Sequence, residues 1–310
     1  MKTILIAGGA GFIGSNLCKK LIQHNKIICL DNLLTGKMSN IQCLMNNTHF
    51  RFINHDIVYT INIDDDIDEI YNLACPASPL KYQMDPVQTL KINFIGTMNL
   101  LELAKEKKCK ILQSSTSEIY GEPECSPQTE AYRGNVNTVG IRSCYDEGKR
   151  ISETLMMDYH RKYNIDIRIV RIFNTYGPNM DIFDGRVIPN FIYQMINNLN
   201  ITVYGDGTQT RSFCYIDDLM DGLVKLMDSN YHQPMNIGNS HEMTMNELIR
   251  IMKQQINTTS IIEFTPLPLD DPTNRKPNIT LAKEILNWEP KIDLITGLRH
   301  TIEFIKTTAT

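Results

Sequence analysis

Two patterns of apolar and polar positions alternate along the first half of the chain. Short apolar runs such as Ile4-Leu5-Ile6-Ala7 and Ile27-Ile28-Cys29-Leu30 are typical of strands buried on both faces of a parallel sheet. Between such runs, apolar residues recur at helical spacing, as Leu17, Leu21 and Ile22 do. This alternation predicts an α/β fold with a Rossmann-type doubly wound parallel sheet. Further strands are expected near 50–54, 69–74, 110–114 and 167–173, and helices at 16–23, about 86–107 and 143–163.

The second half of the chain has a less regular pattern. Helices are expected at 186–199, 217–227, 243–255 and 282–286, with a short strand at 201–204. Five prolines between positions 266 and 290 divide the last part into short pieces. The length of 310 residues also suggests two domains. We expect a first domain at 1–177, to which 211–240 returns, and a smaller α/β lobe made of 178–210 and 241–310.

A glycine-rich segment, Gly8-Gly9-Ala10-Gly11-Phe12-Ile13-Gly14, joins the first predicted strand to the first predicted helix. Glycines at this junction allow a tight turn and close approach of a ligand to the backbone, and the helix N-terminus offers free N–H groups to a pyrophosphate. Asp31 ends the next apolar run, where an acidic residue binds the adenosine ribose. The pattern predicts a dinucleotide site, and Asp31 favours NAD over NADP because a carboxylate repels a 2′-phosphate. The alternative is a tight loop that binds nothing.

Composition excludes several classes of partner. The net charge of −4 and a pI near 6.0 provide no basic field for nucleic acid. No run of about 18 apolar residues suggests a membrane span, and the first strand begins so early that we expect no signal peptide. The eight cysteines form no Cys-x-x-Cys pair and no Cys/His cluster, so we expect reduced thiols, a cytoplasmic protein and no metal site.

Tyr145 and Lys149 lie one helical turn apart in the helix expected at 143–163. The pKa of a free tyrosine is near 10, but a neighbouring ammonium and an oxidised nicotinamide favour its phenolate. Such a pair can remove a proton from a sugar hydroxyl while hydride leaves the same carbon. The segment from Ser114 to Gly121 follows a predicted strand, where side chains face the ligand crevice, and it places Glu118 among hydroxyl residues.

These motifs resemble the extended short-chain dehydrogenase/reductase family of nucleotide-sugar enzymes, and the resemblance covers nearly the whole chain. It is most specific to members that decarboxylate UDP-glucuronate. Departures from the family pattern are Arg133, Thr138, Ile141 and Glu102, which affect a loop and a helix rather than the chemistry. The most specific stretches are Pro76-Ala77-Ser78-Pro79, Thr116-Ser117-Glu118, Arg142 to Arg150, Arg171 to Pro178, Asp184 to Val187, Gln209 to Phe213, Asp270-Asp271-Pro272, Arg275-Lys276-Pro277 and Trp288-Glu289-Pro290.

The resemblance implies a redox-neutral decarboxylation of UDP-glucuronate to UDP-xylose with bound NAD. In this scheme Tyr145 is the base, Lys149 its charge partner and Thr116 the hydroxyl bonded to the reacting oxygen, while Ser117 and Glu118 serve the protonation step. Arg211 is expected at the sugar or diphosphate and Arg275 at the UDP phosphates. Further substrate contacts implied are Pro79, Lys91, Glu118, Asn174 and Tyr204. The cofactor contacts implied are Gly8, Gly11, Phe12, Ile13, Gly14, Asp31, Asn32, Thr35, Gly36, Asp56, Ile57, Leu73, Tyr145, Lys149, Thr175 and Arg186.

Other activities stay open at this point. A nucleotide-sugar 4,6-dehydratase shares the Tyr/Lys pair but needs an acid where this chain has Ser117. A 4-epimerase usually lacks a glutamate at position 118, and a non-catalytic NAD-binding sensor or scaffold would not need Thr116, Tyr145 and Lys149 together. Release of a 4-keto pentose with NADH is a further possibility. The resemblance also implies a homodimer, formed through a four-helix bundle of the helices at about 86–107 and 143–163.

Overall fold

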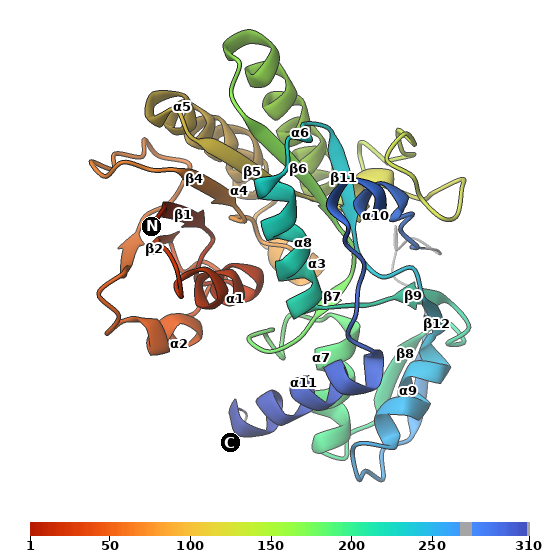
Figure 1. Cartoon of the computed structure of the whole chain (residues 1–310). Helices are drawn as coiled ribbons and strands as arrows, with labels where there is room; N and C mark the ends of the chain where they lie inside the picture. Colours follow the sequence, from red (N-terminus) through yellow and green to blue (C-terminus); the bar gives the residue numbers. More distant parts are fainter. Residues whose placement is uncertain (267–274, 309–310) are drawn as a thin grey trace.

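A parallel sheet of seven strands forms the larger part of the molecule, in the order β3-β2-β1-β4-β5-β6-β11 (Figure 1). This computed structural model describes residues 1–266 and 275–308. The sequence motif Asp270-Asp271-Pro272 lies outside the described residues. The strand order reverses between β1 and β4, which opens a crevice at the carboxyl ends of these strands. The strands are β1 Thr3–Ala7, β2 Lys26–Asp31, β3 Phe50–Asn54, β4 Glu69–Asn72, β5 Lys110–Thr116, β6 Ile167–Ile172 and β11 Pro234–Ile237.

Side chains of the strands alternate between two apolar layers. Ile4 and Ile6 of β1 pack in one layer with helices α1 (Phe12–Leu21) and α8 (Ile216–Asp228). Leu5 and Ala7 pack in the other layer, which includes α5 (Thr97–Lys107) and α6 (Ser143–Tyr163). Both faces of the sheet are therefore covered, as the continuous apolar runs predict. The Rossmann-type fold expected from the sequence is confirmed.

The helix expected at about 86–107 is interrupted. It consists of α4 (Pro86–Lys91), a π-helical turn η2 (Ile92–Gly96) and α5. Asp85 caps its start by accepting a hydrogen bond of 2.9 Å from the backbone N–H of Gln88. The turn brings Gly96 against Ile57, where any side chain would overlap the isoleucine. This close approach, which depends on a distant loop, is the physical reason that the spacing alone did not predict the interruption.

A smaller lobe lies below the sheet in Figure 1. It contains three pairs of short strands and the helices α7, α9 and α11, with α10 packed beside β11. The sequence predicted the helix at 243–255, but its first residues form strand β12, because Met243 pairs with Arg211 of β9. The bounds are β7 Thr175–Tyr176, β10 Cys214–Tyr215, β8 Ile201–Tyr204, β13 Ile262–Thr265, β9 Thr210–Ser212, β12 Glu242–Thr244, α7 Val187–Ile196, α9 Met245–Lys253, α10 Thr280–Leu286 and α11 Leu294–Thr308.

Short helical elements lie in the connections between strands of the main sheet. They are α2 (Met38–Ile41), η1 (Gln42–Leu44), α3 (Pro79–Tyr82) and the 3₁₀ turn η3 (Ser117–Tyr120). Helix α11 was missed, although Leu294, Leu298, Ile302 and Ile305 recur at helical spacing. Strand β11 pairs with β6 in the main sheet. The domain boundaries given above stay a prediction.

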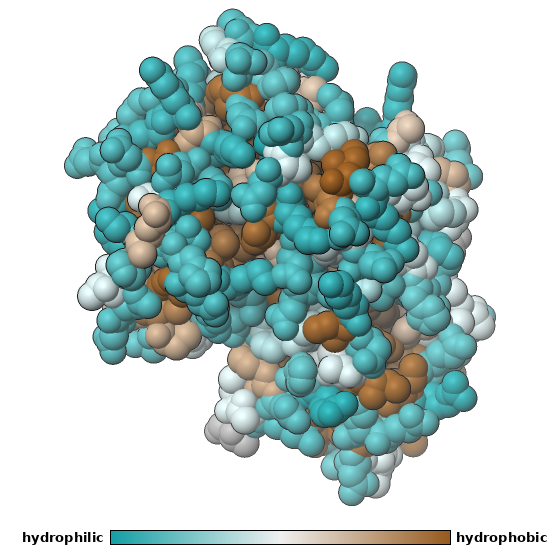
Figure 2. All heavy atoms as spheres, viewed as in Figure 1, coloured by the Kyte–Doolittle hydropathy of each residue, from teal (hydrophilic) through white to brown (hydrophobic). Residues whose placement is uncertain are grey.

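Figure 2 shows a mostly hydrophilic face with scattered apolar residues. Within residues 1–266 and 275–308, no helix combines the length and the hydropathy that a bilayer crossing requires. All eight cysteines are unpaired.

Candidate active site

At the junction of β1 and α1, two positions leave no room for a side chain: Gly8 in the loop and Gly14 in the first turn of α1. Gly8 has a φ of +77°, and a Cβ on it would lie 2.7 Å from backbone atoms of Leu73 and Ala74. A Cβ on Gly14 would overlap the carbonyl oxygen of Gly8. The loop therefore presents bare backbone at the N-terminus of α1, the feature that accommodates a pyrophosphate.

Asp31 is held in place at the end of β2. Its side chain accepts hydrogen bonds from the backbone N–H groups of Ala10 (2.9 Å) and Leu33 (2.8 Å). Burial raises the pKa of Asp31, while these two bonds oppose the rise. A Cβ on Gly36 would lie 2.9 Å from either carboxylate oxygen, so the next loop packs directly on Asp31. The carboxylate is thus fixed beside the glycine loop, as a ribose-binding acid must be.

A cavity of about 370 Å³ lies over this loop, and the residues that line it suit a dinucleotide. The bare glycine backbone and the fixed acid satisfy the needs of NAD. Of the cofactor residues predicted from the sequence, Gly36, Tyr145, Lys149 and Thr175 do not line this cavity. Those that do are Gly8, Gly11, Phe12, Ile13, Gly14, Asp31, Asn32, Thr35, Asp56, Ile57, Leu73 and Arg186.

The opposite wall of the cavity was not foreseen. It is formed by residues 179–184 and by Phe304 and Thr308 of α11. Asn179 donates a hydrogen bond of 3.1 Å to the hydroxyl of Ser15, and Lys37 forms an ion pair of 3.0 Å with Asp181. These contacts join segments more than 140 residues apart, so no local pattern in the sequence signals them.

Tyr145, Lys149 and Thr116 meet where α6 crosses the end of β5. The Lys149 ammonium donates a hydrogen bond of 2.9 Å to the carbonyl oxygen of Ser114 and lies 5.8 Å from the centre of the Tyr145 ring. Burial raises the pKa of Tyr145, and its hydrogen bond with Thr116 acts in the opposite direction. Burial also lowers the pKa of Lys149. The three side chains are brought together, and burial is the largest influence on the pKa of Tyr145.

Tyr82 of α3 is a neighbour of the trio that the sequence reading missed. Its ring stacks on that of Tyr145, with centres 4.8 Å apart and planes 8° from parallel. The Tyr82 side chain is buried, and its hydroxyl has no hydrogen-bond partner among the described residues. The stack fixes the plane of the Tyr145 ring. Only the tertiary fold brings the two tyrosines together, since they lie 63 residues apart in the sequence.

Glu118 lies between two arginines. Arg142, directly before α6, donates a hydrogen bond of 2.5 Å to one carboxylate oxygen, and Arg275 pairs with both oxygens. Arg275 also lies 3.4 Å from the hydroxyl of Ser117. The sequence reading placed Arg275 at the UDP phosphates, whereas here its guanidinium faces Ser117 and Glu118. All three charged side chains are largely buried, so their charges act with little screening.

The structure also places the remaining candidates. Arg186 directly precedes α7 and pairs with Asp184 at 2.7 Å, and both residues line the cavity. Arg211 lies on β9 and donates a 2.9 Å bond to the carbonyl oxygen of Thr210. The other predicted substrate contacts are Pro79 at the start of α3, Lys91 exposed at the end of α4, Asn174 between β6 and β7 and Tyr204 half-exposed on β8. The predicted cofactor contact Thr175 is buried on β7. Their roles stay predictions.

The part of the chain that the structure describes contains no group of three or more His, Cys, Asp or Glu side chains placed to hold a metal ion.

Comparison with known proteins gives a consistent assignment. A family model described as GDP-mannose 4,6 dehydratase matches residues 5–301. The chain belongs to the extended short-chain dehydrogenase/reductase family. UDP-glucuronic acid decarboxylase 5 of Arabidopsis thaliana is 53% identical over 297 residues, covering 95% of this chain and 86% of that protein.

Two further relatives extend the comparison. UDP-glucuronic acid decarboxylase 1 of Xenopus tropicalis is 46% identical over 306 residues, covering 98% of this chain and 72% of that protein. Among solved structures, UDP-glucuronic acid 4-epimerase from Bacillus cereus, in complex with UDP-glucuronic acid and NAD, superposes with a TM-score of 0.88. It is 30% identical and covers 98% of this chain and 99% of that one. The family resemblance inferred from the motifs is confirmed, and NAD is the cofactor.

Proposed function

We propose that this chain decarboxylates UDP-glucuronate to UDP-xylose with NAD that stays bound through the cycle. The observation that carries the proposal is the Arg142–Glu118–Arg275 cluster beside Ser117, next to the Thr116–Tyr145–Lys149 trio. The trio suits oxidation of a sugar hydroxyl. The cluster adds cations that can pair with a sugar carboxylate, and it places Glu118 and Ser117 where they can take part in a proton transfer. The named activity of relatives at 46–53% identity agrees with both.

The cofactor is held by the glycine loop and by Asp31. Bare backbone at Gly8 and Gly14 would leave room for the pyrophosphate, and Asp31 would accept hydrogen bonds from the ribose hydroxyls. When bound, NAD⁺ supplies a hydride acceptor and later returns the hydride to the substrate. Tight retention of NAD belongs to this proposal, and measuring the NAD content of the purified protein tests it.

Tyr145 takes the proton of the hydroxyl at the sugar's fourth carbon. Thr116, which hydrogen-bonds Tyr145, bonds the reacting oxygen, and the buried ammonium of Lys149, 5.8 Å from the centre of the Tyr145 ring, supplies a positive charge beside it. The ketone formed there is β to the carboxylate, so the bond to the carboxylate carbon breaks and its electrons delocalise into an enolate. Tyr145 returns its proton to the oxygen when the ketone is reduced.

Ser117 and Glu118 serve the protonation of the enolate at the fifth carbon. Glu118 is the second residue after Thr116, and its backbone N–H donates a hydrogen bond of 3.3 Å to the Thr116 hydroxyl, so we expect its side chain near the carbon next to the ketone. Arg275 contacts both Ser117 and Glu118, and its planar guanidinium is a suitable partner for the sugar carboxylate. The net reaction consumes one proton and releases CO₂, and no cofactor is consumed.

Product analysis by mass tests the proposal. Purified protein with UDP-glucuronate alone is expected to give UDP-xylose and CO₂ in equal amounts, with no net NADH. Formation of the 4-epimer without CO₂ would assign the chain to the activity named for the Bacillus cereus structure. Activity on UDP-glucose without CO₂ release from UDP-glucuronate would favour a dehydratase.

We further propose a homodimer formed through α4, η2, α5 and α6. Apolar side chains on these helices are exposed in the single chain, among them Val87 (60%), Leu90 (42%), Phe94 (41%) and Ile151 (40%). A second copy of the chain would bury them in a four-helix bundle. Phe94→Glu is expected to convert the dimer to a monomer in sedimentation experiments, whereas a wild-type protein that sediments as a monomer would contradict the proposal.

The cytoplasmic location is likewise a proposal, supported by eight cysteines that are all unpaired. Retention of activity under strong thiol reduction is expected. Loss of activity on reduction would argue against it.

A further inference from the structure

Arg171, the last residue but one of β6, uses all three nitrogens of its guanidinium in hydrogen bonds. Its side chain is 9% exposed, and it pairs with Glu153, which is 13% exposed. Nε donates to one carboxylate oxygen at 3.0 Å and Nη2 to the other at 2.8 Å. Nη1 donates to the Tyr120 hydroxyl at 2.9 Å and to the Glu130 carbonyl oxygen at 3.0 Å. One planar group therefore joins three segments of the chain.

The first link runs through Glu153 to the strand that ends in Thr116. Glu153 follows Tyr145 and Lys149 at four-residue intervals, so the three side chains lie along one face of α6. Its carboxylate accepts a hydrogen bond of 2.5 Å from the hydroxyl of Ser115. Ser115 is also the register partner of Arg171 in the sheet. The contacts of Glu153 with Ser115 and Arg171 thus fix the spacing between α6 and the end of β5. This spacing sets the position of Tyr145 relative to Thr116.

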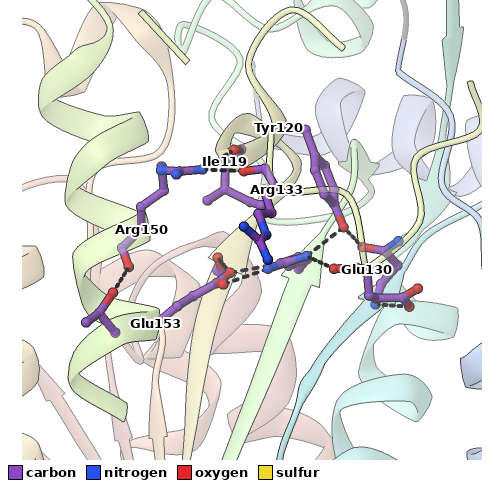
Figure 3. Close-up of polar contacts among 10 residues, drawn as sticks. Ile119, Tyr120, Glu130, Arg133, Arg150 and Glu153 are labelled. Atoms are coloured by element: carbon purple, nitrogen blue, oxygen red, sulfur yellow. Dashed lines mark hydrogen bonds and ion pairs between the residues drawn. The ribbon is translucent and has the colours of Figure 1, made fainter. Parts of the chain in front are cut away.

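The second link runs through Tyr120 to the turn that carries Glu118. The Tyr120 hydroxyl accepts from Arg171 and donates to Asn236 of β11 at 2.8 Å. Tyr120 ends η3, in which Glu118 is the second residue. Arg150 of α6 also holds this turn, with a 3.0 Å bond to the carbonyl oxygen of Ile119 (Figure 3).

The network continues to the segment that carries Arg275. The Asn236 side chain donates to the carbonyl oxygens of Gln128 (3.1 Å) and Asn278 (3.2 Å). Gln128 in turn exchanges backbone hydrogen bonds with Lys276 and Asn278. In Figure 3, Glu153, Tyr120 and Glu130 converge on the guanidinium from different elements. The hydrogen-bond network of Arg171 thereby extends to the turn that carries Glu118 and to the segment that carries Arg275. These two residues flank the sugar carboxylate in the proposed reaction.

A buried ion pair of this kind does not by itself stabilise a fold, because desolvation offsets much of the attraction. What it provides is a fixed geometry, since a bidentate pair admits few orientations. Ser115 connects it to the oxidation site and Tyr120 to the protonation site, through separate hydroxyl groups. The two connections can therefore be cut one at a time.

We propose that Arg171, paired with Glu153, is a positioning residue that holds the oxidation site at Thr116 and Tyr145 and the protonation site at Glu118 in one arrangement. Its side chain bonds Glu153, Tyr120 and Glu130, none of which is assigned here to substrate or cofactor. The inference rests on the proposed decarboxylase function. It predicts that oxidation depends on the link through Ser115 and that protonation depends on the link through Tyr120.

Loss of the link through Tyr120 would make protonation of the enolate slow or misplaced and would allow the ketone to leave the site. The balanced leak is UDP-glucuronate plus NAD⁺ giving a UDP-4-keto-pentose, CO₂ and NADH. The carbon–hydrogen bond at the fourth carbon is oxidised, NAD⁺ is reduced, and the proton released from the hydroxyl is regained by the enolate. One NADH therefore accumulates for every ketone released.

The experiment compares Ser115→Ala, Tyr120→Phe and a control, Tyr132→Phe. The Tyr132 ring also stacks on Tyr120, but its hydroxyl accepts only from the backbone N–H of Glu124 among the described residues. Rapid-quench mass analysis gives the single-turnover rate of UDP-glucuronate consumption and the ratio of free ketone to UDP-xylose. Thermal unfolding of each variant separates loss of fold from loss of position.

Ser115→Ala is expected to slow single-turnover consumption about 10- to 100-fold, as misplacement by about 1 Å can do, without raising the ketone ratio. Tyr120→Phe is expected to raise the ketone ratio several-fold with less change in consumption, and Tyr132→Phe to behave as wild type. Equal changes in both steps, no change in either, or a Tyr132→Phe variant that matches Tyr120→Phe would overturn the inference. If the wild type forms no UDP-xylose, the proposed function fails instead, and the inference fails with it.

Discussion

The cofactor end and the sugar end of this site are built in opposite ways. At the cofactor end, recognition comes from backbone that lacks side chains and from one carboxylate already bonded to two backbone N–H groups. At the sugar end, buried charges face one another, with Glu118 between Arg142 and Arg275. Added side-chain atoms are therefore expected to damage the cofactor end, whereas loss of a charge is expected to damage the sugar end. This difference predicts which substitutions damage which step.

The largest effect is expected where the two ends meet, at Tyr145. Tyr145→Phe removes the proton acceptor but keeps the ring that stacks on Tyr82. Turnover should fall by about a thousandfold or more, within the range of general acid–base catalysis. NAD content and thermal unfolding should stay as in the wild type. A Phe variant with near-normal CO₂ release would show that another group is the base.

A smaller loss is expected at the sugar end from Glu118→Gln, which removes the charge between the arginines and keeps the shape. Turnover should fall by about a hundredfold while NAD content is unchanged. Glu124→Gln, in the exposed loop that follows, is the matched control and should be neutral. Steady-state kinetics with UDP-glucuronate measures both. Equal losses in the two variants would remove the special role of Glu118.

The cofactor end should respond to added atoms. Gly14→Ala places a Cβ against the Gly8 carbonyl oxygen, which the backbone cannot avoid. We expect destabilisation by about 1–3 kcal/mol and at least about tenfold weaker NAD binding. Gly11→Ala is the control, because its Cβ would lie 3.2 Å from the same oxygen and need only a small shift. Calorimetric titration measures the NAD affinity of each variant, and chemical unfolding measures its stability. Equal NAD affinity and equal stability in the two variants would contradict the account.

The smallest effect is expected from an exposed contact that spans the cofactor cavity. Lys37 and Asp181 form an ion pair of 3.0 Å, but the lysine side chain is 50% exposed. Lys37→Ala should weaken the binding free energy of NAD by less than about 1 kcal/mol, which is less than about fivefold in affinity. The cost should shrink further at high salt. A large loss that persists at high salt would show that Lys37 binds the cofactor directly.

The sequence predicted what short segments determine by themselves. The main strands, the glycine loop with Asp31 and the Tyr145–Lys149 pair all follow from spacing within about 25 residues, and the structure brings them together as expected. It did not predict the stack of Tyr82 on Tyr145, the cavity wall at 179–184 or the position of Arg275. Each of these depends on contacts between distant segments, such as Arg275 with Glu118.

The interrupted helix and the missed α11 differ in cause. The π-helical turn at Ile92–Gly96 accompanies the packing of Gly96 against Ile57, a tertiary contact with no local signal. Helix α11 had a regular apolar pattern, which proline-rich surroundings obscured. Attention to the 294–305 spacing would have found it, together with the Phe304 side of the cofactor cavity.

The most direct test of the central claim is the reaction of UDP-glucuronate in D₂O, followed by mass and NMR analysis of the sugar. If the bound cofactor returns its hydride and the enolate is protonated from solvent, UDP-xylose will carry one deuterium at its fifth carbon and none at its fourth. CO₂ will form in equal amount, with no net NADH. Deuterium at the fourth carbon, an unlabelled fifth carbon or a product that keeps its carboxylate would contradict the redox-neutral decarboxylation.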